Sequence, residues 1–319
     1  MLSVNQRPTI ADVEAAATRL HGLVWHTPLL HSAWLSNVTG AQVFLKLETV
    51  QATGAFKIRG ALNALTRLRE TQPAVTTIVT ASAGNHGLAM ATAAAKLGLT
   101  LRVHMPANAP RVKREAIARL GATIIPAPDY DQAEANVQDE VAQSGAMFVS
   151  AYSHSDVIAG AGTIALEMIA DEPRLDSFIV PLGGGGLLSG TAIVARARVP
   201  GALIVGAEAE ASPVFTGALA AGKPVIVPVT ETIADGLAGN MEPDSQTFPI
   251  VRDLVDRIVT VRESLIVQAM RDLVRHERLI AEGAGATAVG ALLSGELPVS
   301  GRCVGVILSG RNVDQPATA

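Results

Sequence analysis

Short apolar runs with strand spacing alternate with longer apolar runs with helical spacing along almost the whole chain. Residues 42–47 (QVFLKL) have the alternating pattern of a strand, whereas residues 58–70 place their apolar side chains near helical spacing. Alternation of this kind builds mostly parallel sheets whose connecting helices cover both faces. The pattern therefore predicts an α/β protein with two parallel-sheet domains and an active site in the cleft between them.

The predicted elements form two consecutive runs. Strands are predicted at residues 42–47, 76–80, 100–105, 122–125, 146–150, 178–182, 203–207 and 302–308. Helices are predicted at residues 9–22, 58–70, 87–97, 110–121, 130–144, 157–170, 187–195, 213–221, 263–276 and 285–293. Thr9 and Asp12 have the spacing of a capping box, and Pro110 suits a first helical turn. We assign residues 1–74 and 153–319 to a large domain and residues 75–152 to a small one.

The composition excludes several classes of protein. Of 319 residues, 49% are hydrophobic and 17% are charged, which excludes disorder and a coiled coil. The 25 basic and 29 acidic residues give a net charge of −4, without the basic surface that nucleic-acid binding needs. The charge-free run 177–195 contains Pro181 and four glycines, which would leave backbone groups unpaired in lipid. We therefore expect neither a nucleic-acid nor a membrane partner.

Four sequence features bear on the cellular location and the metal sites to be expected of this protein. The single cysteine, Cys303, excludes a disulfide framework and a Cys-based zinc site. The first ten residues lack the apolar stretch of a signal peptide, so a cytoplasmic location is expected. The seven histidines show no metal-ligand spacing. Glu208 and Glu210 end a strand and are interpreted as a solvated pair rather than as a cation site.

Three polar, glycine-rich turns each follow a predicted strand directly. They are residues 81–86 (ASAGNH), residues 183–186 (GGGG) and residues 309–312 (SGRN). Ligands of open parallel sheets bind where the carboxyl ends of the strands meet, so these turns are expected to converge on one site. Loops between strands and helices are commonly rich in glycine and serine, which explains any one turn better than all three together.

The four glycines open a predicted helix at Leu187 and have the properties of a phosphate cradle. Without side chains, backbone N–H groups can approach an anion, and the helix N-terminus adds positive potential. No Lys-Ser/Thr pair follows, as a Walker loop requires, and the spacing does not match G-x-G-x-x-G. G-x-G-x-x-A does occur from Gly160 and from Gly283, but neither follows a predicted strand. We interpret both as close helix packing, which disfavours a nucleotide enzyme.

Lys57 is the candidate catalytic residue. It follows Phe56 at a loop-to-helix junction, where a helix N-terminus disfavours positive charge and thereby lowers the pKa of an amine. Such a lysine suits Schiff-base chemistry, whereas an ordinary surface lysine is the alternative. His86, which opens another predicted helix, is either a base or a hydrogen-bonded structural residue.

At these positions the chain resembles the serine/threonine dehydratase (threonine ammonia-lyase) family, fold-type-II enzymes that depend on pyridoxal 5′-phosphate (PLP). The similar segments, within residues 27–314, are residues 46–48 (KLE), 55–60 (AFKIRG), 81–86, 160–167 (GAGTIALE), 180–186 and 308–314 (LSGRNVD). Their order along the chain also matches. The resemblance implies the tryptophan synthase β-like fold, with the active site between its two domains.

The resemblance implies a role for each matched residue. Lys57 would be catalytic and would bind PLP covalently through its amine, and Phe56 would pack against the ring. The other cofactor ligands would be Asn85, Gly183, Gly184, Gly185, Gly186, Leu187 and Ser309. The substrate carboxylate would be bound by Ser82, Asn85 and His86.

Four positions depart from the family pattern. Ala55 replaces the usual serine, Arg311 replaces a glycine, and Tyr152 stands where relatives often have Asn or Phe. In metal-dependent relatives an aspartate follows a strand-end glutamate after six residues, whereas Val214 follows Glu208 here. No metal is therefore expected.

The resemblance implies a PLP-dependent β-elimination that converts an L-3-hydroxy amino acid, threonine- or serine-like, to a 2-oxo acid and ammonia. The alternatives are a dehydratase for a bulkier substrate such as 3-hydroxyaspartate or phenylserine, an amino-acid racemase, and a non-catalytic amino-acid or PLP binding protein. Ala83 favours elimination, because family racemases carry a proton-donating serine there. We expect a homodimer whose partner molecule is a small amino acid.

Overall fold

The structure is a computed structural model that describes residues 6–109 and 111–313. The first half of the chain forms α1 (Ile10–Leu20), β1 (Leu29–His31), α2 (Ala33–Thr39), β2 (Gln42–Leu47), η1 (Glu48–Val50), α3 (Lys57–Thr71), β3 (Thr77–Ala81), α4 (Asn85–Leu97), β4 (Thr100–Pro106), α5 (Arg111–Arg119), β5 (Thr123–Ala127) and α6 (Tyr130–Ser144). The second half forms β6 (Met147–Phe148), α7 (Ser155–Asp171), β7 (Ser177–Pro181), α8 (Gly186–Arg198), β8 (Leu203–Ala209), α9 (Val214–Ala221), η2 (Asp235–Leu237), α10 (Thr247–Leu254), β9 (Arg257–Val261), α11 (Glu263–Asp272), η3 (Leu273–Glu277), α12 (Gly283–Leu293) and β10 (Cys303–Leu308).

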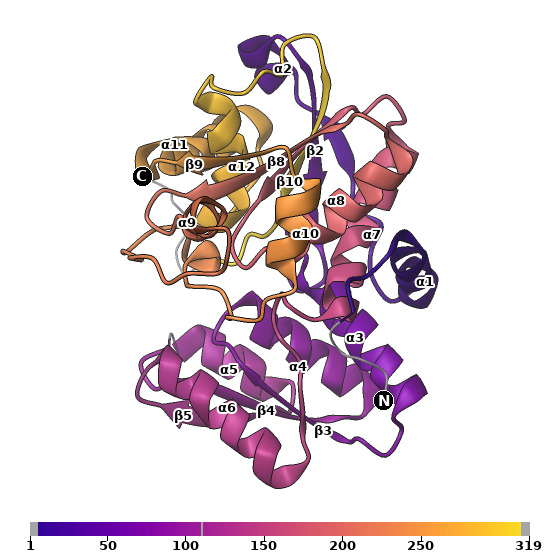
Figure 1. Ribbon diagram of the computed structural model, residues 1–319, viewed down its shortest axis with the longest axis vertical. Helices are drawn as coiled ribbons and strands as arrows, with labels where there is room; N and C mark the ends of the chain where they lie inside the picture. The colour runs from indigo at the N-terminus through magenta and orange to yellow at the C-terminus, as the bar shows by residue number, and fades with distance from the viewer. Residues whose placement is uncertain (1–5, 110, 314–319) are drawn as a thin grey trace.

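The strands form two sheets, one above the other in Figure 1. The upper sheet has six strands in the order β1-β2-β10-β7-β8-β9, and the lower has four in the order β5-β4-β3-β6. Every pair of neighbouring strands is parallel except β1 with β2. Parallel strands need long crossover connections, which helices provide here. The predicted α/β class with two parallel sheets is confirmed. The four-stranded sheet lies within residues 77–148, and the domain boundaries near residues 75 and 152 stay predictions.

Most predicted elements are present with ends shifted by a few residues. The capping box of Thr9 and Asp12 forms at α1, and Gly98 ends α4 in the left-handed region with φ 65°. Pro110 lies outside the described residues, although α5 begins directly after it. The prediction missed four elements, namely β1, α2, α10 and β9. The region 227–247, expected as a loop, contains only the short η2.

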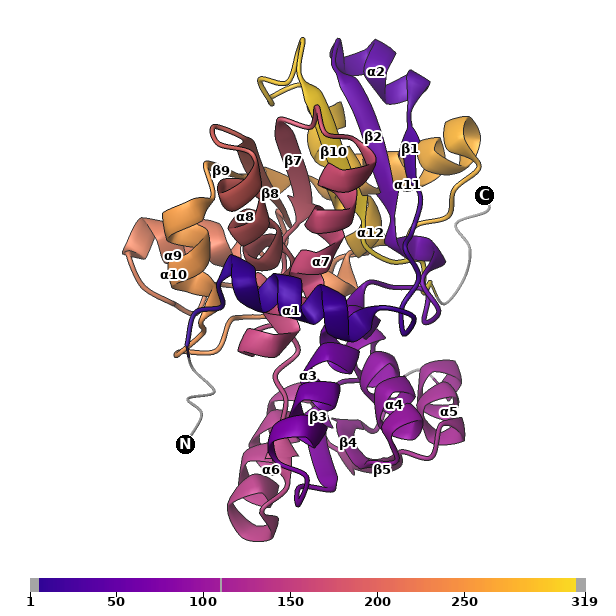
Figure 2. The ribbon, with the colours of Figure 1, turned by 90° about the vertical axis from the view of Figure 1, so that its right-hand side faces the viewer.

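Close packing of α7 against two neighbours positions the helix that begins at Lys57. A Cβ added at Gly160 would lie 2.6 Å from the Arg59 carbonyl oxygen on α3, and one at Gly162 would lie 3.0 Å from the Gly190 carbonyl oxygen on α8. The glycines therefore let the three backbones approach, which confirms helix packing for the motif from Gly160. For the motif from Gly283 the interpretation is wrong, because Gly283 and Gly285 lie against the backbone of Ile233 and Gly310, which are not helical. Figure 2 shows α1 lying across this junction between the two sheets.

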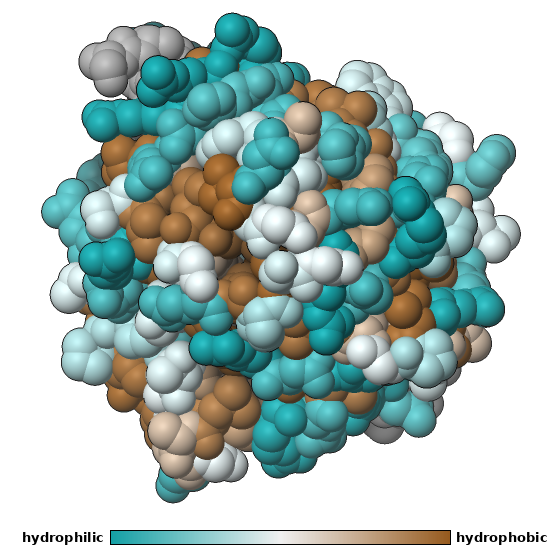
Figure 3. Space-filling view, turned by 90° about the horizontal axis from the view of Figure 1, so that it is seen from above, coloured by the Kyte–Doolittle hydropathy of each residue, from teal (hydrophilic) through white to brown (hydrophobic). Residues whose placement is uncertain are grey.

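No helix of the described residues combines the length and the apolar character that a membrane span needs. Seen from above, the molecule is largely hydrophilic, with hydrophobic residues gathered in several patches (Figure 3). Apolar atoms form a large share of the surface of folded proteins in general, so these patches alone identify no partner. The homodimer and the cytoplasmic location therefore stay predictions.

Candidate active site

The polar turns meet at the carboxyl ends of the strands. Asn85 opens α4 after β3, Asn312 follows β10, and the Asn312 Nδ2 donates a hydrogen bond of 2.7 Å to the Asn85 Oδ1. The glycine turn after β7 reaches the same region, because Gly186 and Leu187 line one small cavity together with Lys57. Segments from distant parts of the chain thus form a single site, as the position of the turns after their strands indicates.

Lys57 is the first residue of α3, and its side chain points into this site. The Nζ donates a hydrogen bond of 2.8 Å to the Ala151 carbonyl oxygen and lies 5.2 Å from the centroid of the Phe56 ring. Burial lowers the pKa of the Lys57 amine to about 8, although the negative charge of Glu282 acts in the opposite direction. A larger fraction of the amine is therefore uncharged near neutral pH, as attack on an aldehyde requires.

The glycine turn forms a cradle that side chains would fill. Gly185 has φ 88°, and a Cβ added at Gly183 would lie 2.9 Å from the Leu237 Cα. A Cβ at Gly186 would lie 2.9 Å from the Tyr152 carbonyl oxygen. Because α8 begins at Gly186, its first N–H groups are available to an anion at this turn.

Tyr152 packs against the glycine turn and reaches across the cleft. A Cβ at Gly184 would overlap the Tyr152 ring, and the Tyr152 hydroxyl accepts a hydrogen bond of 2.9 Å from the backbone N–H of Glu242. Tyr152, which departs from the family pattern, therefore forms one side of the space beside the glycine turn.

Glu282 lies at the centre of the site, where no role was predicted for it. The residue precedes α12 and is 6% exposed, and its Oε1 accepts a hydrogen bond of 2.7 Å from the Asn85 Nδ2. Burial raises the pKa of the Glu282 carboxyl to about 7, against the effect of the bond from Asn85. The sequence feature that indicates a role for Glu282 is its position as a lone acid in an otherwise apolar stretch.

Ser309 is buried where β10 ends. Its carbonyl oxygen accepts a hydrogen bond of 2.9 Å from the Phe56 N–H. Its hydroxyl makes no hydrogen bond to another of the described residues, and a serine hydroxyl can donate one hydrogen bond and accept others from a bound ligand. The neighbouring Arg311 is exposed, so its charge does not enter the site.

Ser82 and His86 already have partners within the protein. The Ser82 Oγ accepts hydrogen bonds from the N–H groups of Gly84 and Gly87, at 3.2 and 3.1 Å. The His86 Nε2 lies 3.1 Å from the Thr80 Oγ1, and burial, together with the positive charge of Lys57, lowers the pKa of His86 to about 3. So low a pKa makes the ring a weak base, which favours the structural interpretation of His86. Substrate binding by both residues stays a prediction.

Glu208 is held by the start of α9. Its carboxylate accepts hydrogen bonds of 3.0 Å from the N–H groups of Phe215 and Thr216, and another from the Thr216 hydroxyl. Within the described chain, no group of three His, Cys, Asp or Glu residues could hold a metal ion. Glu208 is thus buried and bonded within the protein, so its interpretation as part of a solvated pair is wrong.

Removing divalent cations should therefore change activity less than twofold. A hard cation needs several oxygen ligands, and Val214 supplies none from its side chain. Turnover would be measured before and after dialysis against a chelator, and again after adding Mg²⁺ or Ca²⁺. Loss in the chelator that a cation restores would contradict this prediction.

A buried amine of lowered pKa beside a glycine cradle, on a two-sheet α/β fold, defines a class of enzyme that binds a phosphorylated aldehyde cofactor. Comparison with known proteins gives the particular family. The model of the pyridoxal-phosphate dependent enzymes matches residues 20–310, and the chain belongs to this family.

Individual relatives differ in the reaction that their names state. The chain is 40% identical to an L-threonine ammonia-lyase of Geobacter sulfurreducens, covering 95% of this chain and 75% of the relative. It is 38% identical to an L-threo-3-hydroxyaspartate ammonia-lyase of a Pseudomonas species, covering 95% of both. A solved structure of maize serine racemase superposes with a TM-score of 0.91 at 34% identity, over 97% of this chain and 95% of that chain. The predicted family, fold type and cofactor are confirmed.

The residues present fit PLP. Lys57 supplies the amine, the cradle at residues 183–186 suits the phosphate, and the free Ser309 hydroxyl suits a ring nitrogen. The roles predicted for individual residues stay proposals.

Binding of PLP to the cofactor-free protein should accelerate as the pH rises through about 8. The Lys57 amine must lose its proton before it attacks the aldehyde, and burial lowers its pKa to about 8. The rate would be followed by absorbance after mixing. Glu282→Gln removes a charge that raises the pKa of Lys57, so its midpoint should shift to lower pH. A midpoint near 10.5, the ordinary value, would contradict the prediction.

Proposed function

We propose that the protein is an ammonia-lyase that converts an L-3-hydroxy amino acid of the threonine or serine type to a 2-oxo acid and ammonia. The observation that carries the proposal is the buried Lys57 amine together with Ala83, whose methyl group cannot donate a proton. The neighbouring Ser82 Oγ accepts hydrogen bonds from the N–H groups of Gly84 and Gly87, which fixes its place on the turn. A base at Lys57 with no proton donor at position 83 favours elimination over inversion of the α-carbon.

Bound PLP supplies the electron sink for the electron pair released at the substrate α-carbon. The Lys57 Nζ removes the α-proton and holds it, while the Ala151 carbonyl oxygen, 2.8 Å away, orients the amine. The neutral Ser309 hydroxyl would bond the ring nitrogen without adding a charge. The β-hydroxyl leaves as water with the proton that Lys57 took from the α-carbon. One water re-enters when the product is hydrolysed, so one 2-oxo acid and one ammonia result.

The remaining matched residues would bind the cofactor and the substrate carboxylate. Gly183, Gly184, Gly185 and Gly186, with the Leu187 amide, would bind the phosphate, and the Phe56 ring would pack against the cofactor ring. Asn85 uses one N–H for Glu282 and its oxygen for Asn312, so its second N–H is available to the cofactor's ring hydroxyl. Ser82, Asn85 and His86 would surround the substrate carboxylate.

Elimination should exceed racemisation by at least about a hundredfold, because general acid catalysis typically contributes that much or more and the Ala83 methyl cannot donate a proton. The measurement is chiral chromatography of residual L-serine and L-threonine alongside assays of 2-oxo acid and ammonia. Ala83→Ser, which adds a hydroxyl, should raise racemisation and serves as the matched variant. The inverted isomer accumulating as fast as the 2-oxo acid in the natural protein would instead support a racemase, the second candidate that the maize relative suggests.

A further inference from the structure

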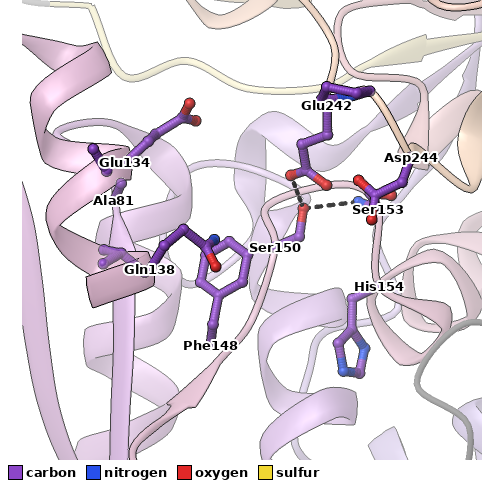
Figure 4. Close-up of a pocket in the computed structure, with 12 residues that line it drawn as sticks. Ala81, Glu134, Gln138, Phe148, Ser150, Ser153, His154, Glu242 and Asp244 are labelled. Carbon is purple, nitrogen blue, oxygen red and sulfur yellow. Dashed lines mark hydrogen bonds between the residues drawn. The ribbon is translucent and has the colours of Figure 1, made fainter. Parts of the chain in front are cut away.

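A cavity of about 550 Å³ opens beside the Lys57 site. Its lining includes Ala81 at the end of β3, Ser150 after β6, and the loop that carries Glu242 (Figure 4). The void that Lys57 itself lines has a volume of only about 10 Å³, which is too small for an amino-acid side chain. Ser150 lines the larger cavity and Ala151 the smaller one, so the larger cavity is the neighbouring space with room for a substrate side chain.

The segment 150–152 contacts both Lys57 and the loop that carries Glu242. The Ala151 carbonyl oxygen accepts the 2.8 Å hydrogen bond from the Lys57 Nζ. On the same segment, the Ser150 Oγ donates a hydrogen bond of 2.6 Å to the Glu242 Oε1, and the Tyr152 hydroxyl accepts one of 2.9 Å from the Glu242 N–H. Glu242 is thus fixed, by side chain and backbone, to the strip of chain that also holds the catalytic amine.

The charge of the lining is one-sided. Glu134, Glu242 and Asp244 line the cavity, and no lysine or arginine does so among the residues described. In Figure 4 the Glu242 carboxylate lies directly above Ser150 on the cavity wall. Like charges in a partly buried site repel more strongly than in water, so this wall disfavours a second anionic group.

We propose that Glu242 determines substrate specificity: it admits 3-hydroxy amino acids whose side chain is neutral or positively charged and excludes those with a second carboxylate. This inference rests on the proposed function, since it names the substrates of the same site. It separates the threonine-like substrates from 3-hydroxyaspartate, on which one of the relatives acts by its name. An enzyme gains specificity from a group that repels the wrong substrate as well as from groups that attract the right one.

The test compares L-asparagine with L-aspartate, which share a shape and lack the leaving hydroxyl. Their dissociation constants for the PLP-loaded protein at pH 8 would be measured from the change in cofactor absorbance. L-Asparagine should bind at least about tenfold more tightly than L-aspartate, the order expected for one close pair of like charges. Glu242→Gln and the shorter Glu242→Ser should each reduce this ratio to about threefold or less, so the test does not depend on one variant folding.

Glu231→Gln is the matched control, because it removes one negative charge from an exposed position in the same long loop. It should leave the ratio unchanged. Equal weakening of both ligands by the Glu242 variants, with the ratio intact, would show a purely structural role and overturn the inference. So would a natural protein that binds L-aspartate as tightly as L-asparagine. Failure to form 2-oxo acid from L-threonine or L-serine would contradict the proposed function alone, because the binding ratio needs no turnover.

Discussion

Replacing Lys57 by alanine should reduce turnover of L-threonine and L-serine by more than about a thousandfold. The Lys57 amine is proposed both to hold the cofactor and to move the α-proton, and positioned proton transfer alone typically contributes 10²–10⁴-fold. His86, whose pKa Lys57 influences, cannot take over this role, because burial lowers its pKa to about 3 and makes the ring a weak base.

Borohydride reduction followed by peptide mapping provides a second readout that does not depend on activity. The natural protein should carry a reduced cofactor on the peptide containing Lys57, and the Lys57→Ala variant should carry none. Lys96→Ala removes an exposed lysine at the end of α4 and serves as the control, with labelling and turnover unchanged. Label on a different lysine in the natural protein would remove the catalytic assignment of Lys57.

The residues around Lys57 show which parts of a site a sequence can reveal. Lys57, the four glycines and the turn at residues 81–86 lie in short segments, where composition and position after a strand already indicate chemistry. Glu282 differs, because its role comes from contacts across the fold. Asn85 meets Glu282 at 2.7 Å although 197 positions separate them along the chain. No local pattern specifies such a pairing.

Among the secondary-structure elements too, those with a local sequence pattern were predicted and those that depend on distant pairing were missed. Gln42–Leu47 was predicted with the observed ends, and Tyr130–Ser144 likewise, because each has a clear period over enough residues. The strand β1 has only three residues, too few to show a period, and it forms by pairing with β2. The strand β9 is similarly defined by its pairing with β8 at the sheet edge, a contact that only the assembled fold supplies.

Replacing Arg59 by methionine should destabilise the protein by about 3–5 kcal/mol, the cost of leaving buried charges without their partner. Arg59 is 1% exposed and lies two residues after Lys57 on α3. It donates hydrogen bonds of 2.8 and 2.9 Å to the Glu48 carboxylate, and of 2.6 and 2.9 Å to that of Glu167. Lys46 Nζ contacts only one of these acids, Glu167, at 2.7 Å.

The loss arises mainly from Glu48, which is fully buried and would keep only the hydroxyl of Thr27 as a close donor. Burial lowers the pKa of Arg59, but the charge and hydrogen bonds of Glu48 raise it above the ordinary value, so the guanidinium stays charged. The double variant Arg59→Met/Glu48→Gln removes the unpaired charge as well. It should recover at least about 1 kcal/mol of the loss, because replacing both members of a buried pair is far less costly than removing one.

Free energies of unfolding would be measured by denaturant titration of the PLP-loaded protein. Arg69→Met, at an exposed position on the same helix, is the control and should change the free energy by less than about 0.5 kcal/mol. A loss below about 1 kcal/mol for Arg59→Met would show that the network contributes little to stability. Since α3 begins at Lys57, a network that holds Arg59 to η1 and α7 also fixes the position of the Lys57 amine. The folded fraction of Arg59→Met should therefore bind PLP more weakly than the Arg69→Met control.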